Sequence, residues 1–312
     1  MHTKLKGIIF RIEKVVNTII WAVFPQKKVL VLNVHLKNCV NKINPINLGD
    51  DLNLVVAKEL SNRTIVNTLY SFISVFKPLN YMCIGSIVDT LTNKQSIIWG
   101  SGAMYGDENK IIIKPKKVFA VRGPLTRQYL LGQGISCPEI YGDPAILLPL
   151  FYSCKREKKY KMGLIPHYAD YNTLIVNNIQ KRYGEDVKVI NMKKYKKWEN
   201  IVESICECDF IISSSLHGLI IADAYGVPNL WIKLSDRVKG DDFKFRDYFE
   251  GCKKTNIKPI DCRIEDISLE FFKNKLSQYK RPQYNIHGLL NSCPFITEEK
   301  KKELLLRIGG DV

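Results

Sequence analysis

The chain has 312 residues, enough for one large or two ordinary domains, and 46% of them are hydrophobic, enough for a substantial buried core. It carries 47 Lys and Arg residues against 31 Asp and Glu residues, a formal net charge of +16. Such a surplus favours anionic partners: nucleic acid, an anionic membrane surface or a phosphorylated substrate. The cations are mostly Lys and lie along the whole chain without an Arg-rich arm, so we expect no nucleic-acid partner.

The nine cysteines indicate neither a disulfide framework nor a zinc site. Their number is odd, no two have the CxxC spacing, and Cys206 and Cys208 form only a CxC pair. We therefore expect no bound metal, and reduced thiols in a cytoplasmic protein.

Residues 8–24 are rich in apolar residues, but Arg11, Glu13 and Lys14 interrupt them, so the stretch is too broken to span a membrane. No small-residue cleavage site of a signal peptide follows. Apolar residues recur at helical spacing, which predicts an amphipathic helix over residues 1–26. They are Ile8, Ile12, Val15 or Val16, Ile19 and Val23. This basic helix lies either at an anionic membrane surface or against the protein's own core.

From residue 28 onward, short apolar runs alternate with segments of helical periodicity, which predicts parallel α/β sheets. Strands are expected at residues 28–34, 96–99, 117–121, 161–166, 187–190, 209–213 and 229–232, with a short extended segment at 139–140. Helices are expected at residues 50–60, 124–131, 171–183, 198–206, 216–225 and 297–308.

A polar, charged stretch at residues 153–161 interrupts this alternation. It is the natural linker between two α/β domains, although it could also be a charged loop within one sheet. We predict an N-terminal helix (1–26), two α/β domains (27–153 and 154–286) and a C-terminal helical segment (287–312).

Three turns combine the end of a strand, a Gly- or Ser-rich step and the start of a helix. Free backbone N–H groups and the helix dipole make such turns anion sites, and ligands of open α/β sheets gather at the carboxyl ends of strands. The three are NLGDDLN (47–53), AVRGPLT (120–126) and SSSLHG (213–218).

In the first turn, Gly49 permits a tight bend, and Asp50 or Asp51 can cap the helix or supply a general acid or base. In the second, Arg122 would lie at the strand end beside Gly123, where a guanidinium can grip a carboxylate or phosphate in bidentate fashion or form a surface salt bridge.

In the third turn, three serines supply helix caps and His217 falls in the first helical turn. A helix N-terminus lowers the pKa of an imidazole, so a neutral His217 is favoured that could act as a base or as a hydrogen-bond donor, or be merely structural. His167, at the end of the 161–166 strand, and Asp143, in the YGDPA turn, are weaker candidates for which turn structure is the simpler interpretation.

Together and in this order, the motifs resemble the polysaccharide pyruvyl transferase family. The matching blocks are NLGDD (47–51), AVRGPLT (120–126), YGDPAILLP (141–149), GLIPHY (163–168), SSSLHGLIIADAYGVP (213–228) and KFRDYF (244–249). The resemblance covers roughly residues 28 to 250, and it is the ordered set that is specific.

The resemblance implies two Rossmann-like domains arranged as in GT-B glycosyltransferases, with the active site in the interdomain cleft and the last helix packing back on the first domain. It implies transfer of pyruvate from phosphoenolpyruvate to a sugar as a ketal, without an obligatory metal or organic cofactor. The acceptor would be a polysaccharide, or a lipid-linked oligosaccharide, of bacterial capsule or exopolysaccharide biosynthesis. The enzyme would then act at the inner face of the cytoplasmic membrane, in peripheral contact with it.

The family's Arg-Leu-His-Gly is here Ser215-Leu216-His217-Gly218, so the histidine matches and the arginine does not. Either Arg122 and a lysine such as Lys239 or Lys244 compensate, or donor binding differs. The resemblance thus assigns catalysis to His217 with Asp50 or Asp51. It assigns donor binding to Arg122, Gly123, Ser214, Ser215, Gly218, Lys239 and Lys244, and acceptor binding to Asn47, Gly49, His167 and Asp143.

Two other functions fit the same sequence. A GT-B glycosyltransferase would use the anion sites for a nucleotide diphosphate, and Glu199 and Glu207 have a spacing seen in retaining enzymes, although they more simply form one solvated helix face. A membrane-docked scaffold that has lost catalysis would explain the missing arginine.

Overall fold

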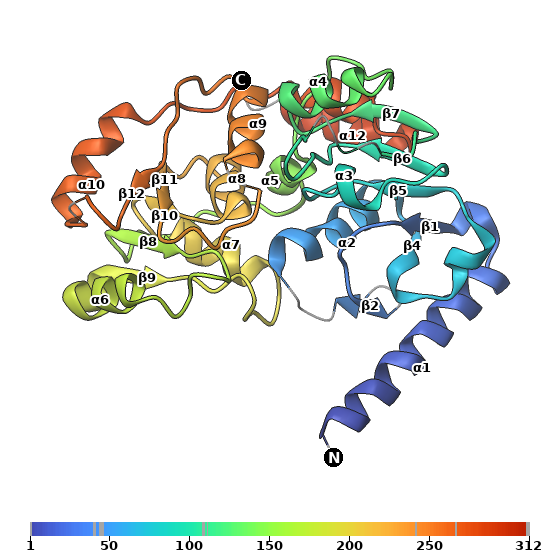
Figure 1. Cartoon of the computed structure of the whole chain (residues 1–312), viewed down its shortest axis with the longest axis horizontal. Helices are drawn as coiled ribbons and strands as arrows, with labels where there is room; N and C mark the ends of the chain where they lie inside the picture. The colour runs from blue at the N-terminus through green and yellow to red at the C-terminus, as the bar shows by residue number, and fades with distance from the viewer. Residues whose placement is uncertain are drawn as a thin grey trace. The chain divides into compact units, whose positions relative to one another are not determined.

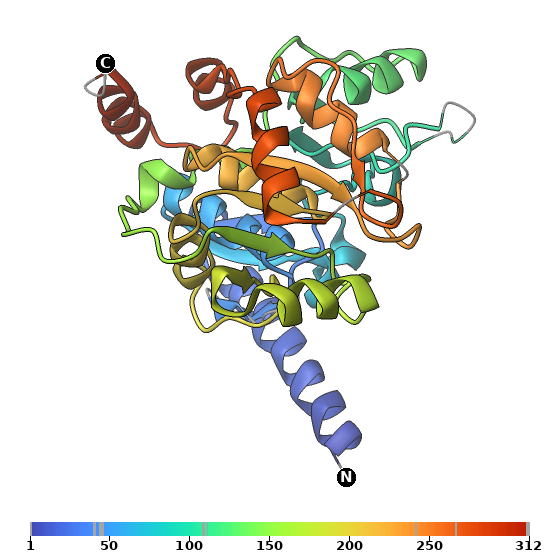
Figure 2. The same ribbon diagram turned by 90° about the vertical axis from the view of Figure 1, so that its left-hand side faces the viewer.

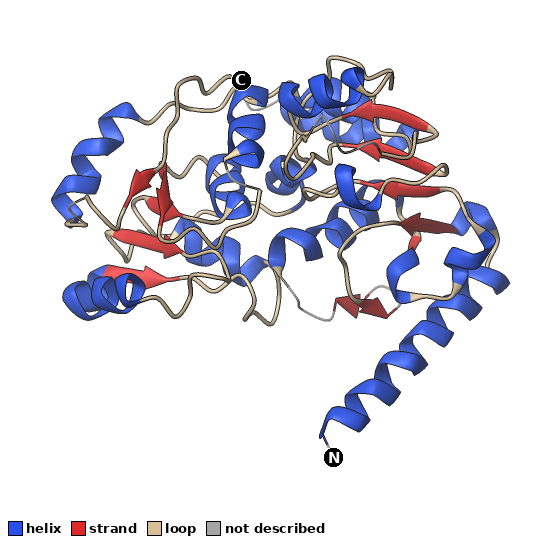
Figure 3. Cartoon of the chain, in the orientation of Figure 1, coloured by secondary structure: helices blue, strands red, loops and turns tan. Residues whose placement is uncertain are grey.

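The computed structural model of the chain describes residues 2–39, 42–43, 47–107, 110, 112–240, 242–265 and 267–309. The chain divides into two compact units, one formed by Met1–Pro144 with Asn285–Val312 and the other by Ala145–Tyr284. Each unit is built on a five-stranded parallel sheet with helices around it (Figures 1 and 3). The predicted α/β class is confirmed, and each unit is consistent with a Rossmann-like domain.

The sheet of the first unit has the strand order β4-β1-β5-β6-β7. Its strands are β1 (Val29–Leu32), β4 (Thr64–Asn67), β5 (Asn80–Met82), β6 (Ser96–Trp99) and β7 (Lys117–Ala120). All residues of β1 and β6 are buried, as expected where helices cover both faces of a parallel sheet. A small antiparallel hairpin, β2 (Asn38–Cys39) and β3 (Lys42–Ile43), precedes α2.

The helices of the first unit are α1 (His2–Val23), α2 (Leu48–Ser61), α3 (Val88–Leu91), α4 (Pro124–Gly132), α11 (Ile286–Asn291) and α12 (Glu298–Gly309). Short 3₁₀ turns are η1 (Gln26–Lys28), η2 (Thr68–Tyr70) and η3 (Ile73–Phe76). No helix in the described part of the chain combines the length and the apolar content that crossing a membrane requires.

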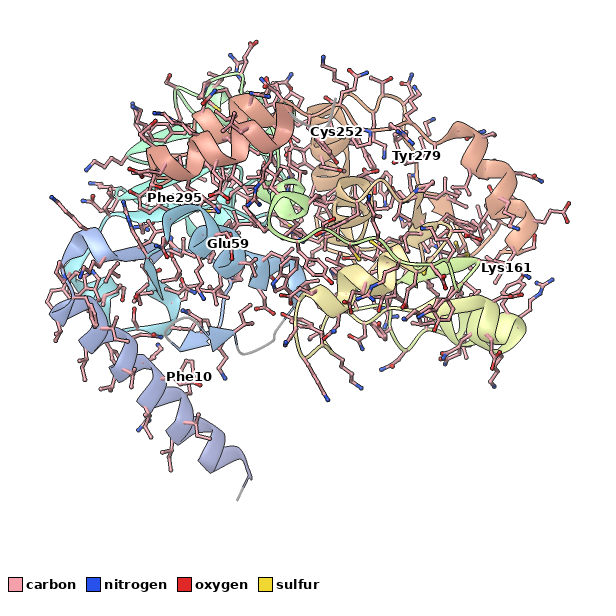
Figure 4. The ribbon with its side chains drawn as sticks, turned by 180° about the vertical axis from the view of Figure 1, so that it is seen from behind. Phe10, Glu59, Lys161, Cys252, Tyr279 and Phe295 are labelled. Atoms are coloured by element: carbon pink, nitrogen blue, oxygen red, sulfur yellow. The ribbon has the colours of Figure 1, made fainter. Side chains whose placement is uncertain are left out.

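The C-terminal segment packs on the first unit. Phe295, labelled in Figure 4, makes edge-to-face contacts with Tyr81 and Trp99, at 5.3 and 5.4 Å between ring centroids. The indole N–H of Trp99 donates to the carbonyl of Leu289 (3.0 Å). Because β5 and β6 carry two of these rings, the segment that follows the second unit is anchored to the sheet of the first.

The sheet of the second unit has the order β12-β11-β10-β8-β9. Its strands are β8 (Met162–Ile165), β9 (Val187–Val189), β10 (Ile211–Ser213), β11 (Asn229–Lys233) and β12 (Ile260–Asp261). Its helices are α5 (Leu148–Phe151), α6 (Leu174–Tyr183), α7 (Glu199–Cys206), α8 (Leu216–Ala224), α9 (Phe243–Gly251) and α10 (Leu269–Lys275), with 3₁₀ turns η4 (Pro144–Leu147), η5 (Gly184–Asp186) and η6 (Leu276–Gln278).

The boundary between the units differs from the predicted one. We expected it in the charged stretch 153–161, but the units divide after Pro144. The intervening residues include α5, which packs on α8, and Tyr152, whose hydroxyl donates to Glu203 (2.8 Å). These apolar residues therefore belong to the core of the second unit, and the charged stretch lies along its surface, where the Lys158 amino group donates to backbone carbonyls of the same unit.

The predicted extended segment at residues 139–140 is not a strand. The neighbouring Tyr141 instead forms an isolated parallel bridge with Val121. Strands β4, β5 and β12 and helices α9 and α10 were not predicted, because their segments are too short to show a clear period.

Candidate functional site

The carboxyl ends of three neighbouring strands in the second unit are joined by one buried carboxylate. Because β8, β10 and β11 are adjacent and parallel, their ends lie at one edge of the sheet. Asp170, fully buried in the loop after β8, accepts the hydroxyl of Ser214 (3.0 Å) and the hydroxyl of Ser235. The backbone N–H of His167 donates in turn to the Ser214 hydroxyl (2.8 Å).

The sequence analysis did not identify Asp170 as a site residue. The only local indication was its position in HYADY, two residues beyond the GLIPHY block. An aspartate in such a loop would ordinarily be a solvated turn residue. Here its hydrogen bonds connect the loops after β8, β10 and β11, which makes it a positioning residue for His167 and Ser214.

The start of α8 is packed tightly against the sheet. The Ser213 hydroxyl accepts the N–H of Ser215 (3.0 Å) and lies within 2.9 Å of the carbonyl of Ile165, to which it donates. A Cβ on Gly218 would lie 2.5 Å from the Ser213 hydroxyl and 2.9 Å from an Ile165 methyl. The glycine predicted to bind donor is thus required for the close approach of helix and strand, and Ser215 is the N-cap residue of α8.

His217 is half-buried in the first turn of α8, as the motif predicted. For His167, in the loop after β8, burial first and the cations of Lys244 and Lys193 next lower the pKa to about 4. Its Nδ1 accepts the N–H of Ala169 (3.3 Å), which leaves Nε2 as the protonated nitrogen of the neutral ring. His167 is therefore a neutral hydrogen-bond donor at physiological pH.

The two lysines proposed to replace the family arginine lie in different environments. Lys244, in the first turn of α9, is buried, and its charge acts on His167. Lys239 is exposed in the loop between β11 and α9. Of the two lysines, only Lys244 is enclosed, and its amino group lies over the Phe245 ring at 5.5 Å from the centroid.

A pocket of about 160 Å³ adjoins Ser214 at this edge of the sheet. Its aromatic wall is the pair Trp231 and Phe245, stacked at 4.5 Å and 15° between ring planes. Ser235 and Lys233 add polar groups. The carboxylates of Asp236 and Asp242 complete the lining, and a pocket with an apolar wall, hydroxyls and charges of both signs suits a small polar ligand with one apolar side.

In the first unit, the NLGDD carboxylates hold the start of α2. The buried Asp51 accepts the backbone N–H of Asn47 (3.2 Å), and Asp50 accepts the Asn47 side-chain amide (3.1 Å). Gly49 is buried in the same turn. Asp50 is half-buried and Asp51 fully buried, so of the two Asp50 is the one that a substrate could reach.

Arg122 is enclosed rather than presented at the surface. It is 1% exposed, and its guanidinium donates to the hydroxyl of Ser86 (2.6 Å) and the carbonyl of Ala103 (2.7 Å). Gly102 lies against the guanidinium with no room for a Cβ. These contacts pin the loops after β5 and β6, while Gly123 is the extended N-cap of α4.

Asp143 is also buried in the first unit. The pKa of the Cys83 thiol is raised well above its usual range by burial first, then by Cys293 and by the Asp143 carboxylate. That carboxylate therefore lies near the Cys83 thiol, enclosed by the protein.

The structure thus brings His167, Ser214 and Lys244 together in the second unit, and Asn47, Asp50 and Asp51 together in the first. Arg122 and Asp143 are enclosed in the first unit, and Lys239 lies on the surface of the second. The donor, acceptor and catalytic assignments themselves stay predictions.

Comparison with known proteins places these motifs in one family. The model of the polysaccharide pyruvyl transferase family matches residues 47–236. Uncharacterized protein L143 of Acanthamoeba polyphaga mimivirus is 28% identical over 239 residues, 74% of this chain and 81% of that protein. Succinoglycan biosynthesis protein ExoV of Rhizobium meliloti (strain 1021) is 28% identical over 211 residues, 65% of this chain and 60% of that protein. No solved structure matches.

Proposed function

Because the chain belongs to the polysaccharide pyruvyl transferase family, we propose that it transfers pyruvate from phosphoenolpyruvate to a sugar of a lipid-linked polysaccharide repeat unit. The observation that carries this proposal is the family match over residues 47–236, which spans all three candidate anion turns. The similarity to a succinoglycan biosynthesis protein supports a role in polysaccharide biosynthesis.

The proposed reaction balances without a cofactor. A proton is added to the methylene carbon of phosphoenolpyruvate, which becomes a methyl group and leaves an oxocarbenium-like centre at C2. One sugar hydroxyl adds to C2 and loses its proton, which balances the proton consumed. The C2–O bond to phosphate then breaks, the second hydroxyl adds in its place, and its proton leaves with phosphate. The products are the cyclic ketal and inorganic phosphate.

We assign proton transfer to His217 and anion binding to Lys244, with Asp50 or Asp51 as the partner of His217 on the acceptor side. The neutral His167 would donate its Nε2–H to an oxygen of the acceptor sugar, and the Ser214 hydroxyl accepts the backbone N–H of the same residue. Lys244 then supplies the positive charge that the family places at Ser215.

The finer fold prediction, a GT-B-like pair of domains with the active site in a cleft between them, remains part of this proposal. It is supported by the two Rossmann-like units and by the family resemblance. A cocrystal with phosphoenolpyruvate tests it, since density confined to one unit with no contact from the other would contradict a shared site.

The donor is tested by offering phosphoenolpyruvate and a nucleotide sugar in separate reactions with a lipid-linked oligosaccharide acceptor. We expect inorganic phosphate release and a pyruvate ketal on the acceptor, detected by mass spectrometry, only with phosphoenolpyruvate. Nucleotide release from the sugar donor would instead establish the glycosyltransferase alternative, and absence of phosphoenolpyruvate binding in calorimetry would support an inactive scaffold.

Replacing His217 with alanine should lower kcat by about 10²–10⁴-fold, the usual contribution of general acid–base catalysis, while the variant keeps the circular dichroism spectrum of the parent. Near-normal turnover by this folded variant would remove His217 from the proton-transfer role.

Lys244→Met should raise the KM for phosphoenolpyruvate by about tenfold or more, since a charge-assisted hydrogen bond to an anion contributes about 1.5–3 kcal/mol. Lys239→Met makes the same chemical change on an exposed residue of the same unit and is the matched control. Equal effects of the two substitutions would contradict the assignment to Lys244.

A further inference from the structure

Helix α1 packs on its unit by a face that is partly polar. Asn17, fully buried, donates its side-chain amide to the carbonyls of Asn38 (2.8 Å) and Tyr70 (2.9 Å). Phe10, labelled in Figure 4, meets Tyr70 edge to face at 5.5 Å. Trp21 packs near β1 and stacks on Phe76 at 5.4 Å.

The opposite face of α1 is apolar and exposed. The residues that the sequence placed on one stripe point outward, so the alternative in which this stripe packs on the protein's own core is wrong. They are Ile8, Ile12, Val15, Ile19 and Val23, each between 46% and 73% exposed. A surface helix ordinarily buries its apolar stripe and exposes polar residues, and α1 does the reverse. The stripe covers about 22 Å of helix at 1.5 Å per residue.

Turn η3 and the preceding Phe72 lie beside the C-terminal half of α1, on the side by which the helix packs on its unit. Phe72, Val75 and Phe76 are exposed within the same 46–73% range. Phe76 stacks on Trp21, and the backbone N–H of Phe72 donates to the hydroxyl of Thr18 (2.9 Å). We call the outward stripe of α1 the docking face. Figures 1 and 2 show α1 as a rod that extends beyond the rest of the first unit.

An apolar surface of this extent marks an interaction site, and the surrounding charges select its occupant. Along residues 8–28 the exposed or half-buried cations Arg11, Lys14, Lys27 and Lys28 outnumber the single carboxylate, Glu13, and Lys77 follows η3. Two copies of this chain meeting through the docking face would bring these like charges together, whereas an anionic bilayer would neutralise them.

We propose that the docking face binds the surface of an anionic bilayer, with α1 lying parallel to it and the apolar stripe inserted at the level of the headgroups. This surface uses no residue of the candidate site, so it stands independently of the proposed reaction. It places the enzyme where a lipid-linked acceptor would be presented.

The experiment is cosedimentation of the full chain with vesicles of phosphatidylcholine alone or with added phosphatidylglycerol. We expect binding to the anionic vesicles that falls at high salt, and at least tenfold weaker binding of the double variant Ile12→Asp, Ile19→Asp. The matched control, Ile264→Asp with Leu306→Asp, makes the same charge change at apolar residues that are even more exposed and lie elsewhere, and should bind as the parent does.

Equal binding of the two double variants would overturn the proposal, as would equal binding to anionic and neutral vesicles. A parent chain that fails to bind vesicles but forms a dimer that Ile12→Asp, Ile19→Asp abolishes would overturn it in favour of a second copy. Turnover of a water-soluble acceptor should be the same for both variants. Vesicle binding without any transfer would therefore contradict the proposed function and leave the docking face in place.

Discussion

At the scale of single residues, the protonation state of His167 is set by the groups that surround its ring rather than by a position on a helix. A helix N-terminus favours the neutral form of any imidazole nearby, which is why His217 was the expected residue. His167 is neutral because its ring is buried and because Lys244 and Lys193 stand near it. Both lysines come from segments distant in sequence, and their approach to His167 could not be inferred from the GLIPHY block.

The depressed pKa of His167 predicts a pH dependence of stability. The unfolded histidine takes up a proton near pH 6.5, and the folded one near pH 4, so between these values the unfolded state binds more protons. Stability should therefore fall as the pH is lowered from 7 to 4.5, by an amount on the order of 2 kcal/mol from this group, allowing for its partial exposure. Urea titrations at pH 7.5 and 5 measure it.

The variant His167→Gln should lose this contribution, so that its stability relative to the parent improves at pH 5. A difference between parent and variant that is the same at both pH values would contradict the assignment.

At the scale of secondary-structure elements, the α8 N-terminus shows why the SSSLHG motif has its particular residues. Ser213 ties the strand end to both Ile165 and Ser215, and Gly218 lets the first turn of α8 approach β8. The motif thus builds a rigid edge that presents Ser214 and His217. Gly218 and Ser213 have structural roles, and the functional candidates of the motif lie between them in the chain.

Substitution of Gly218 by alanine should destabilise the protein by about 1–3 kcal/mol, the usual cost of overpacking, because the new Cβ meets Ser213 and Ile165. Gly132→Ala, at the last position of α4 with open space around it, is the matched control and should be neutral or stabilising by up to about 1 kcal/mol. Chemical denaturation compares the two. A Gly218→Ala protein as stable as the control would show that the helix shifts at no cost.

The elements were predictable where apolar runs are long and caps are clear. The sequence predicted α2, α4, α8 and β6 to within about two residues, since their periodicity and flanking Gly, Pro or Ser residues are local. Strands such as β5, with the sequence NYM, form because neighbouring strands pair with them, and that information is not present in the segment itself.

At the scale of the whole molecule, one buried carboxylate fixes the path of the chain through the second unit. Asp223, at the end of α8, pairs with the buried Lys254 at 2.9 Å and accepts hydroxyls of Tyr248 (2.8 Å) and Tyr279 (3.0 Å). Burial raises the pKa of both tyrosines, with the Asp223 charge as the next cause. The Tyr248 hydroxyl also meets that of Tyr284, the last residue before the chain returns to the first unit.

Removal of one partner should therefore destabilise the second unit strongly. Lys254→Met leaves Asp223 as a buried charge without its cation, which costs about 3–5 kcal/mol. Lys258→Met removes an exposed lysine from the same loop and should change stability by less than about 0.5 kcal/mol. The comparison is made by thermal and urea unfolding, and near-equal stabilities would show that the tyrosine hydroxyls and the Asn229 side-chain amide satisfy Asp223 without Lys254.

The sequence by itself determined the α/β class, the main elements and the family, because periodicity, helix caps and motif order are local patterns. It also identified His167, Ser214, His217 and Lys244 as candidates. The tertiary structure alone decided which of these meet, as in the hydrogen bond from the His167 backbone N–H to the Ser214 hydroxyl across 47 residues of chain. It also decided that Arg122 is enclosed and that the apolar stripe of α1 faces outward. Both depend on which surfaces the fold covers, and burial is a property of the packed chain rather than of any segment.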